Sequence, residues 1–290
     1  MFQGSFVAIV TPFKNNEIDE PALRNLIDWH IQSGTDGIVP CGTTGESATL
    51  SHEEHNRVVR ITVEQVNKRI KVLAGTGSNA TSEALRMTRN AKEAGADGCL
   101  LITPYYNKPT QEGLFRHFEA IAKAVDIPLI LYNVPGRTAV NMLPLTVKRC
   151  ATLSNIIGIK EASGDLDQIR DIIKFCGPDF LILSGEDAQN HAIMKLGGKG
   201  VISVTANCLP SRVADLCRQC LKKNDAAAEK IQDELSEIND VLFIETNPIP
   251  IKTAMALMGK VREEFRLPLC PMGEKNKKQL EAVLKKYELM

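Results

Sequence analysis

Short runs of aliphatic residues alternate with longer amphipathic stretches over most of the chain. The runs follow one another about every 28 residues, which is the size of one strand-loop-helix unit. Most of them are continuously apolar, as is typical of parallel strands that are covered on both faces. They lie at residues 6–10, 37–39, 70–74, 98–102, 128–132, 156–160, 180–184 and 200–204.

The stretches between the runs carry the start and stop signals of helices. Ser51 and Glu54 form a capping box, and Thr81 opens a second helix. Gly34 and Gly95 stand where two helices should end. Eight strand-helix units in succession predict an α/β protein with a (β/α)8 TIM barrel over residues 1–224.

Beyond residue 224 the strand pattern stops and helical patterns take over. They cover residues 225–241, 250–260 and 273–288. We therefore expect a C-terminal helical region over residues 225–290, placed to make a contact between subunits.

An open, doubly wound sheet is the alternative architecture. Residues 75–80 match the loose GxGxxA pattern of dinucleotide-binding turns and follow an apolar run. Because they follow the third run rather than the first, a tight glycine turn at the rim of a barrel explains them equally well. We expect no cofactor there.

The composition is that of a globular protein with a substantial core. The 290 residues are 43% hydrophobic and 24% charged, and 35 basic residues balance 35 acidic ones. No stretch gathers one sign of charge as nucleic-acid-binding proteins do, so we expect a small-molecule partner and no nucleic acid. No apolar run approaches the ~18 residues of a membrane helix, and residues 1–5 lack the basic start of a signal peptide. These features predict a cytoplasmic protein that does not bind membranes.

The cysteines and histidines do not predict a metal site. Eight cysteines are scattered through apolar or helical surroundings, as is typical of buried thiols in a reducing compartment. Cys217 and Cys220 form a CxxC pair, which without a second pair or nearby histidines is interpreted as structural. His52 and His55 are three residues apart and are interpreted as polar helix residues before metal ligands.

In a (β/α)8 barrel the chemistry lies at the C-terminal ends of the strands and in the loops that follow them. The second run leads into residues 42–46, Gly-Thr-Thr-Gly-Glu. The backbone N–H groups and hydroxyls of such a turn suit an oxyanion, for example a substrate carboxylate. An ordinary polar turn explains this pattern equally well on its own.

Three of the four tyrosines, Tyr105, Tyr106 and Tyr132, occupy strand ends. A phenol passes a proton when it is hydrogen-bonded to another hydroxyl, so Tyr106 and Tyr132 could belong to a proton relay. Thr43 or Thr44 would supply the other hydroxyl. A single strand-end tyrosine is more often a packing residue at the rim.

The sixth run ends in Lys160, whereas most other lysines lie in polar helices or loops. An ammonium at the mouth of an apolar barrel is partly desolvated, which lowers the pKa of a lysine toward values at which the free amine attacks a carbonyl. The alternative is a lysine whose stem packs on the rim while its charge reaches water.

The loops after the seventh and eighth runs lack the glycine-rich and basic lining of the usual barrel phosphate site. They read Ser-Gly-Glu-Asp at residues 184–187 and Thr-Ala-Asn-Cys at residues 205–208. We do not expect a phosphorylated substrate.

Three separated motifs together resemble the dihydrodipicolinate synthase/N-acetylneuraminate lyase family. They are Gly-Thr-Thr-Gly-Glu at 42–46, Tyr-Asn-Val-Pro at 132–135 and Gly-Ile-Lys-Glu-Ala at 158–162. The resemblance extends from residue 4 to residue 250. In the synthase branch it implies a Schiff-base condensation of pyruvate with L-aspartate-4-semialdehyde, the entry to diaminopimelate and lysine biosynthesis, without a metal or organic cofactor.

The resemblance assigns catalytic roles to four residues. Lys160 is the nucleophile toward the keto group of pyruvate, and Tyr132 shuttles protons during imine and enamine formation. Thr43 and Tyr106 complete the relay. In the family the tyrosine at the Tyr106 position reaches into the neighbouring subunit's site, which implies a homodimer that is usually paired into a tetramer.

Two further residues are expected to hold substrate carboxylates. Thr44 corresponds to the residue that helps to hold the pyruvate carboxylate, and Arg137 to the one that binds the semialdehyde carboxylate with its guanidinium fork. The Pro-Gly-Arg-Thr loop at 135–138 favours the synthase over relatives that act on N-acetylneuraminate or keto-sugar acids. Those relatives remain the main alternative.

The resemblance also implies inhibition by L-lysine, the product of the pathway. In inhibited members lysine binds at the dimer interface through positions that are here Ser47, Ala48, His52, His55, Asn79, Glu83 and Tyr105. The alternative is a capped helix with ordinary surface polar residues.

A different class of function is a barrel that has lost catalysis and senses a ligand. The joint presence of Lys160, Tyr132, Tyr106 and Thr43 argues against it.

Overall fold

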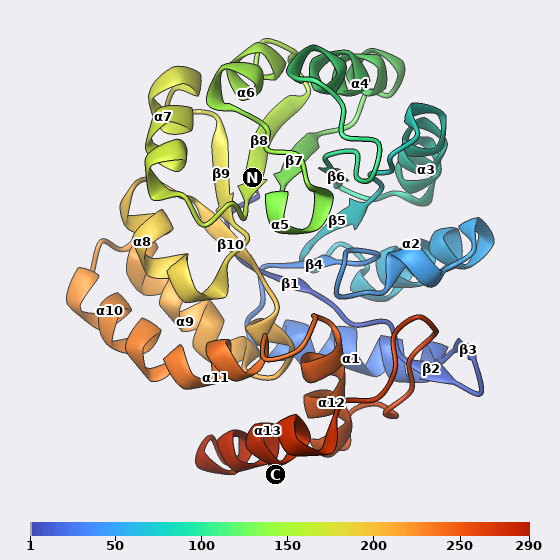
Figure 1. The fold of residues 1–290 in the computed structure, drawn as a ribbon, viewed down its shortest axis with the longest axis vertical. Coiled ribbons are helices and arrows are strands. Elements are labelled where there is room, and N and C mark those ends of the chain that lie inside the picture. The colour runs from blue at the N-terminus through green and yellow to red at the C-terminus, as the bar shows by residue number, and fades with distance from the viewer. Residues whose placement is uncertain (1) are drawn as a thin grey trace.

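The computed structural model describes residues 2–290, and parallel strands form a closed barrel at its centre (Figure 1). The strands follow one another around the barrel in chain order, with β10 closing against β1. The barrel strands are β1 (Gly4–Ala8), β4 (Gly37–Val39), β5 (Lys71–Gly75), β6 (Gly98–Ile102), β7 (Leu129–Asn133), β8 (Ile156–Glu161), β9 (Leu181–Ser184) and β10 (Gly200–Ser203). The expected (β/α)8 barrel is confirmed, and the open sheet is excluded.

The first strand lies two residues earlier than the apolar run predicts. Gly4 stands opposite Gly200 in the ladder between β1 and β10. A Cβ on Gly200 would lie 2.3 Å from the carbonyl oxygen of Gly4, so two glycines allow the strands to pair there. Ile9 and Val10 are buried but lie beyond β1, where the Val10 N–H donates to Oδ1 of Asn207 at 3.1 Å.

A small hairpin that the sequence did not predict follows β1. It consists of β2 (Phe13–Lys14) and β3 (Glu17–Ile18), which pair antiparallel. Asn15 and Asn16 between them have φ values of 55° and 63°, as a two-residue hairpin turn requires. Strands of two residues are too short for the alternation that reveals a longer strand.

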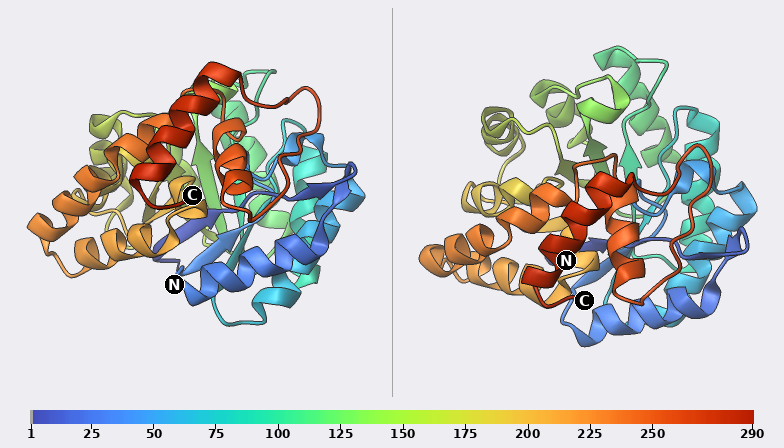
Figure 2. Two further views of the ribbon diagram at one scale, coloured as in Figure 1. Left: turned by 90° about the horizontal axis from the view of Figure 1, so that it is seen from below. Right: turned by 60° about the horizontal axis from the view of Figure 1, so that its bottom comes forward.

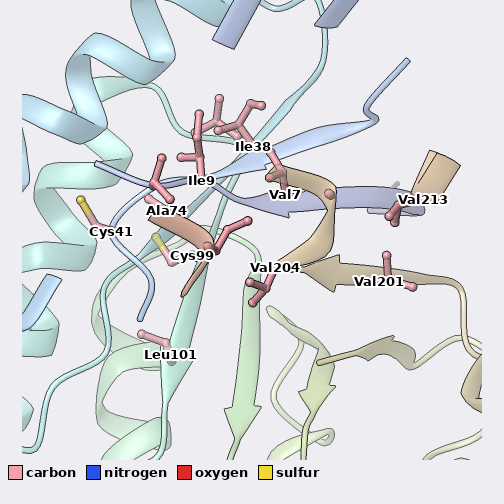
Figure 3. Close-up of a cluster of buried hydrophobic side chains, with 14 of the residues drawn as sticks. Val7, Ile9, Ile38, Cys41, Ala74, Cys99, Leu101, Val201, Val204 and Val213 are labelled. Carbon is pink, nitrogen blue, oxygen red and sulfur yellow. The ribbon is translucent and has the colours of Figure 1, made fainter. Parts of the chain in front are cut away.

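The barrel strands are buried on both faces, and their side chains alternate between two apolar layers. Phe6, Ala8 and Ile130 belong to the layer inside the barrel. Val7 and Ile9 belong to the layer between the strands and the surrounding helices (Figure 3). This double burial explains why the strands appear in the sequence as continuous apolar runs.

Helices surround the barrel, and most of them connect the end of one strand to the start of the next (Figure 1). They are α1 (Glu20–Gln32), α2 (His52–Val66), α3 (Thr81–Ala94), α4 (Gln111–Ala124), α5 (Pro135–Thr138), α6 (Pro144–Cys150), α7 (Leu166–Cys176), α8 (Asn190–Lys195) and α9 (Pro210–Leu221). Short 3₁₀ turns lie at Ser47–Thr49, Asp187–Gln189 and Thr205–Asn207. The expected capping box is present: Ser51 Oγ accepts from the Glu54 N–H at 3.2 Å, and Glu54 Oε2 accepts from the Ser51 N–H at 2.9 Å.

The last helices gather on one side of the barrel, where they appear orange to red (Figure 2). They are α10 (Asp225–Glu234), α11 (Ser236–Val241), α12 (Ile249–Leu257) and α13 (Glu274–Lys286). Helices are present in all three expected stretches, with a break at Leu235 between α10 and α11, and α12 ends three residues before the predicted end. Most of α12 is covered, since Ile249 to Met255 are all buried. A division into two units at residue 224 stays a prediction.

The cysteines are free thiols. Burial raises the pKa of Cys220 to about 11 and that of Cys217 well above its ordinary value, so neither is a ready thiolate. Among residues 2–290 no group of three or more His, Cys, Asp and Glu side chains is arranged to hold a metal ion. Within that same range no helix combines the length and apolarity that crossing a membrane requires.

Candidate active site

Lys160 and Tyr132 lie side by side at the C-terminal ends of two neighbouring strands. They are direct partners in the ladder between β8 and β7. The Lys160 Nζ is 4.2 Å from the centre of the Tyr132 ring, and the two residues are only 6% and 7% exposed. Because the inner layer includes Tyr132, its ladder partner also points into the barrel. The structure thus brings together the predicted nucleophile and the predicted proton shuttle.

Room for the Lys160 side chain comes from Gly185, which follows β9. A Cβ at Gly185 would lie 2.7 Å from Cε of Lys160 and 2.8 Å from Cβ of Ala162. A larger residue would therefore displace the lysine stem. The pKa of the half-buried Glu186 is raised, mainly by burial and to a lesser degree by the negative charge of Asp187. The positive charge of Lys160 opposes this shift.

A buried polar network supports the two strands on their outer face. Glu161 accepts hydrogen bonds from Nδ2 of Asn133 at 3.1 and 3.2 Å and from Nε2 of Gln168 at 3.2 Å. The Ser163 N–H donates to the same carboxylate at 2.8 Å, and Asn133 also donates to Oδ1 of Asn141 at 2.8 Å. Burial raises the pKa of Glu161, although these hydrogen bonds favour its charged form. The network ties the segment carrying Lys160 to the one carrying Tyr132.

The turn over residues 42–46 is closed by its own backbone and held by its neighbours. The Gly45 and Glu46 N–H groups donate to the carbonyl oxygens of Gly42 and Thr43, each at 3.1 Å. The Thr11 hydroxyl donates to the Gly45 carbonyl at 2.7 Å. The turn follows β4 at the mouth of the barrel, where its N–H groups and hydroxyls can meet a ligand.

Glycines at 75 and 77 are required by close packing, which supports the interpretation of residues 75–80 as a rim turn. A Cβ at Gly75 would lie 2.3 Å from the carbonyl oxygen of Cys41. A Cβ at Gly77 would lie 2.4 Å from the backbone nitrogen of Ile102. Each glycine therefore permits contact with a neighbouring segment of the rim.

A cavity of about 490 Å³ opens at this end of the barrel. Thr43, Tyr132 and Arg137 line it, as the sequence predicts for residues of one site. Lys160 is not among the lining residues, but it contacts Tyr132, which does line the cavity. The cavity is also lined by Thr138 and Asn247, to which the sequence analysis assigned no role.

Asn247 joins the two residues expected to hold substrate carboxylates. Its side-chain Nδ2 donates to Oγ1 of Thr44 at 3.1 Å, and its carbonyl oxygen accepts from Nη2 of Arg137 at 3.2 Å. Thr44 is buried, whereas Arg137 on α5 is exposed. Asn247 lies in the segment that carries the family resemblance, but the sequence does not show which residues it contacts.

Tyr106 does not lie with the other proposed relay residues of its own chain. It is 90% exposed and has a φ of 73°, so the loop after β6 carries it outward. Tyr106 is therefore not seen in the cavity of its own chain, and its part in a relay with Tyr132 and a threonine stays a prediction. Only Tyr132 and Thr43 meet at the cavity.

Most of the residues expected to bind lysine line the same cavity. They are Ser47, Ala48, His52, His55, Glu83 and Tyr105. Asn79 is not among the lining residues, and its carbonyl oxygen accepts from Nδ2 of Asn107 at 2.9 Å. The cavity is thus continuous from the barrel mouth to the ends of α2 and α3.

Glu83 is the carboxylate at that far end. Its Oε1 lies 3.7 Å from Nε2 of His52, and its Oε2 accepts from the Ser78 hydroxyl at 2.8 Å. His55 contacts the Gly75 carbonyl oxygen through Nε2 at 2.7 Å, and burial lowers the pKa of this histidine. A neutral imidazole and a carboxylate suit a ligand with an ammonium group, such as an amino acid, better than they suit a purely anionic ligand.

Comparisons with known proteins match the chain over its whole length. The model of the dihydrodipicolinate synthetase family matches residues 1–287. A 4-hydroxy-tetrahydrodipicolinate synthase from Thermodesulfovibrio yellowstonii is 57% identical over 290 residues, which is 100% of both chains. The structure of dihydrodipicolinate synthase from Aquifex aeolicus is 50% identical and superimposes with a TM-score of 0.98 over 99% of both chains.

Two further similar structures contain small molecules. The chloride-inhibited dihydrodipicolinate synthase (DHDPS) from Acinetobacter baumannii, complexed with pyruvate, is 45% identical, with a TM-score of 0.98 over 100% of both chains. The DHDPS from Cyanidioschyzon merolae with lysine bound is 37% identical, with a TM-score of 0.97 over 100% of this chain and 99% of its own.

We expect Gly185→Ala to slow the trapping of Lys160 by pyruvate and borohydride about tenfold or more, because the added methyl displaces the amine from its position. Mass spectrometry of the intact protein over time measures this rate. The matched control is Gly136→Ala, where a Cβ has open space. Equal trapping rates in the two variants would show that Gly185 does not position Lys160.

Proposed function

The chain belongs to the dihydrodipicolinate synthetase family, and we infer that it condenses pyruvate with L-aspartate-4-semialdehyde to 4-hydroxy-tetrahydrodipicolinate through a Schiff base on Lys160. This is the first committed step toward diaminopimelate and lysine. The observation that carries the mechanism is the buried Lys160 amine at 4.2 Å from the Tyr132 ring, at the mouth of a closed barrel. Both substrates are small and water-soluble, and we propose a cytoplasmic location for the enzyme.

Lys160 opens the reaction as a neutral amine. Its Nζ attacks the keto carbon of pyruvate, the carbonyl oxygen leaves as water, and a protonated imine remains. The imine withdraws electrons from the neighbouring methyl group, so loss of one methyl proton gives an enamine. No metal or organic cofactor takes part in these steps.

Carbon–carbon bond formation and release complete the reaction. The enamine carbon attacks the aldehyde carbon of the second substrate, whose oxygen takes up a proton and becomes a hydroxyl. The amino group of that substrate then attacks the imine carbon, closes the ring and displaces the Lys160 amine. Tyr132 and Thr43, which line the cavity, are placed to move these protons.

The carboxylates of the substrates meet separate groups. Thr44 accepts from Asn247 through Oγ1, which leaves its own hydroxyl proton free to donate to the pyruvate carboxylate. The Arg137 guanidinium has one N–H on the Asn247 carbonyl, and its remaining donors are free for the carboxylate of the semialdehyde. Asn247 therefore sets the distance between the two carboxylate-binding groups.

Pyruvate and borohydride should add one reduced pyruvyl group per chain, and Lys160→Ala should abolish the adduct. Arg137→Ala should keep the adduct while turnover with the semialdehyde falls about 10²-fold, because only the second substrate loses its charged partner. Mass spectrometry and a coupled rate assay measure the two steps, and Lys174→Ala on the exposed face of α7 is the control.

The two alternative functions, a ligand-sensing barrel and a lyase for keto-sugar acids, predict different results in these assays. Wild-type protein that forms no adduct would exclude the Schiff-base mechanism and favour a ligand-sensing barrel. An adduct that reacts with a keto-sugar acid acceptor and not with the semialdehyde would favour the lyase relatives. Equal loss of both steps in Arg137→Ala would contradict the role of Arg137.

We also propose that two chains share each site, as the family resemblance implies, and that such dimers pair into tetramers. Tyr106 is 90% exposed and in the left-handed region, which is a costly backbone conformation for a bulky residue. A neighbouring chain that receives this phenol would complete the relay with Thr43 and Tyr132. The exposed Tyr105 lies beside it.

Co-expressed chains carrying Lys160→Ala or Tyr106→Phe test this sharing. Each variant alone should be impaired, but a mixed dimer should recover about half the wild-type rate, because one of its two sites combines an intact Lys160 with the partner's Tyr106. Differently tagged chains allow the mixed dimer to be purified and assayed. A mixed dimer no faster than the average of its parents would show that Tyr106 does not act across the interface.

L-lysine is the inhibitor that we propose for the far end of the cavity. Glu83, with His52 and Ser78 around its carboxylate, offers an acceptor for an ammonium group. Ser47 and Ala48 line the same end and are joined through the chain to the catalytic turn. The relative from Cyanidioschyzon merolae has lysine bound, which supports the choice of ligand.

Millimolar L-lysine should lower the rate, and Glu83→Gln should raise the half-inhibiting concentration about tenfold or more through loss of a charge-assisted hydrogen bond. Each inhibition curve is measured relative to that variant's own uninhibited rate. Glu53→Gln, on the exposed face of the same rim, is the control. A wild-type rate that does not change with lysine would contradict the proposal.

A further inference from the structure

The catalytic turn is attached to the C-terminal part of the chain through a fully buried ion pair. The Nζ of Lys252, on α12, contacts Oε1 of Glu46, and the side chains of both residues are 0% exposed. The two residues are 206 positions apart in the sequence. By comparison, the neighbouring pair of Arg266 and Glu54 retains exposures of 12% and 25%.

The surroundings of this pair make it costly to keep charged. The Lys252 ammonium lies 4.0 Å from the centre of the Phe13 ring and 5.4 Å from that of Phe265. Burial lowers the pKa of Lys252 to about 8, and the attraction of Glu46 opposes this shift. Well-packed apolar residues in place of a buried ion pair are often as stable or more so. Stability alone is therefore a poor explanation for this pair, whereas a requirement for defined geometry explains it.

The ion pair holds Glu46 in an unfavourable backbone conformation. Glu46 ends the turn over residues 42–46 with a φ of 53°, and Cys41 precedes the turn with a φ of 56°. Residues with a Cβ adopt this region against a steric cost and remain there when the surroundings hold them. The Glu46 N–H donates to the Thr43 carbonyl at 3.1 Å, so the position of Glu46 sets that of Thr43.

The segment that carries Lys252 holds the turn at a second point. Asn247, just before α12, donates to the Thr44 hydroxyl at 3.1 Å. Beyond α12, the Arg266 N–H lies 3.4 Å from the second carboxylate oxygen of Glu46. The turn is thus held from one side by consecutive parts of the same C-terminal segment.

We propose that Lys252 is a positioning residue of the active site: its ion pair with Glu46 holds the turn over residues 42–46 in the shape that presents Thr43 and Thr44 to pyruvate. This role rests on the proposed function, in which these two threonines serve the first substrate. Lys252 itself is fully buried beside Phe13 and Phe265 and does not touch the substrate.

The test is the double variant Glu46→Gln/Lys252→Met, which removes both buried charges and keeps similar side-chain volumes, so that it folds without an unpaired charge. We expect its KM for pyruvate to rise about tenfold, which corresponds to about 1.4 kcal/mol. Its KM for the semialdehyde, which depends on Arg137, should change less than twofold. The concentration of pyruvate that gives half-maximal trapping by borohydride should rise by the same factor as the KM.

The control is Glu263→Gln/Lys277→Met, which removes another ion pair of the C-terminal region. That pair spans 2.7 Å with exposures of 26% and 24%, and neither residue contacts the turn. Its KM for pyruvate should equal that of the wild type. Thermal unfolding of each variant shows that the assays are made on folded protein.

A double variant with wild-type affinity for pyruvate would overturn the proposal, whatever its melting temperature. An equal rise in both KM values would overturn it as well, since that result indicates a general loosening of the barrel mouth. If the wild type forms no pyruvate adduct, the proposed function itself fails. That outcome is recognised before any variant is compared.

Discussion

The parallel register between β7 and β8 determines which chemical groups face the substrate. Tyr132 stands opposite Lys160, and the next pair in the ladder is Asn133 and Glu161. Because side chains alternate, the first pair points into the barrel and the second pair points toward the helices, where Gln168 joins it. A slip of one residue would exchange the two sets and turn the amine away from the interior of the barrel. The apolar residues on both faces of the strands, which fix the register, are therefore as necessary to the proposed chemistry as Lys160.

Those apolar residues are also the reason that the sequence predicted the barrel well. Runs buried on both faces are continuous and repeat with the length of one β/α unit, so each barrel strand could be located from the positions of the runs. The structure differs from the prediction where side chains give no hydrophobic pattern. Gly4 and Gly200 pair at the edge of the ladder without any apolar signal, and the hairpin around Asn15 and Asn16 is too short to show a period.

The site could be predicted only in part, because much of it depends on contacts between distant segments. Lys160 and Tyr132 each end an apolar run, and that position indicated their importance. Asn247 and Thr44 are 203 residues apart, and no local pattern predicts their hydrogen bond. The sequence did mark Lys252 as unusual, since it is the one charged residue of the mostly apolar α12. The exposure of Tyr106 could not be deduced from residues alone, because the direction of a loop depends on its backbone rather than on hydrophobic period.

The turn over residues 42–46 is the element that the two ends of the cavity share. Thr43 lines the cavity near Tyr132, and Ser47 and Ala48, which follow the turn directly, line it toward α2. The turn is bounded by two residues in a costly backbone region, so its shape is imposed by its neighbours rather than preferred by its own sequence. A ligand that changes the contacts of Ser47 or Ala48 acts on the same short segment that presents Thr43. Coupling between the two ends then requires only that this segment have a second arrangement, and no longer path through the barrel is needed.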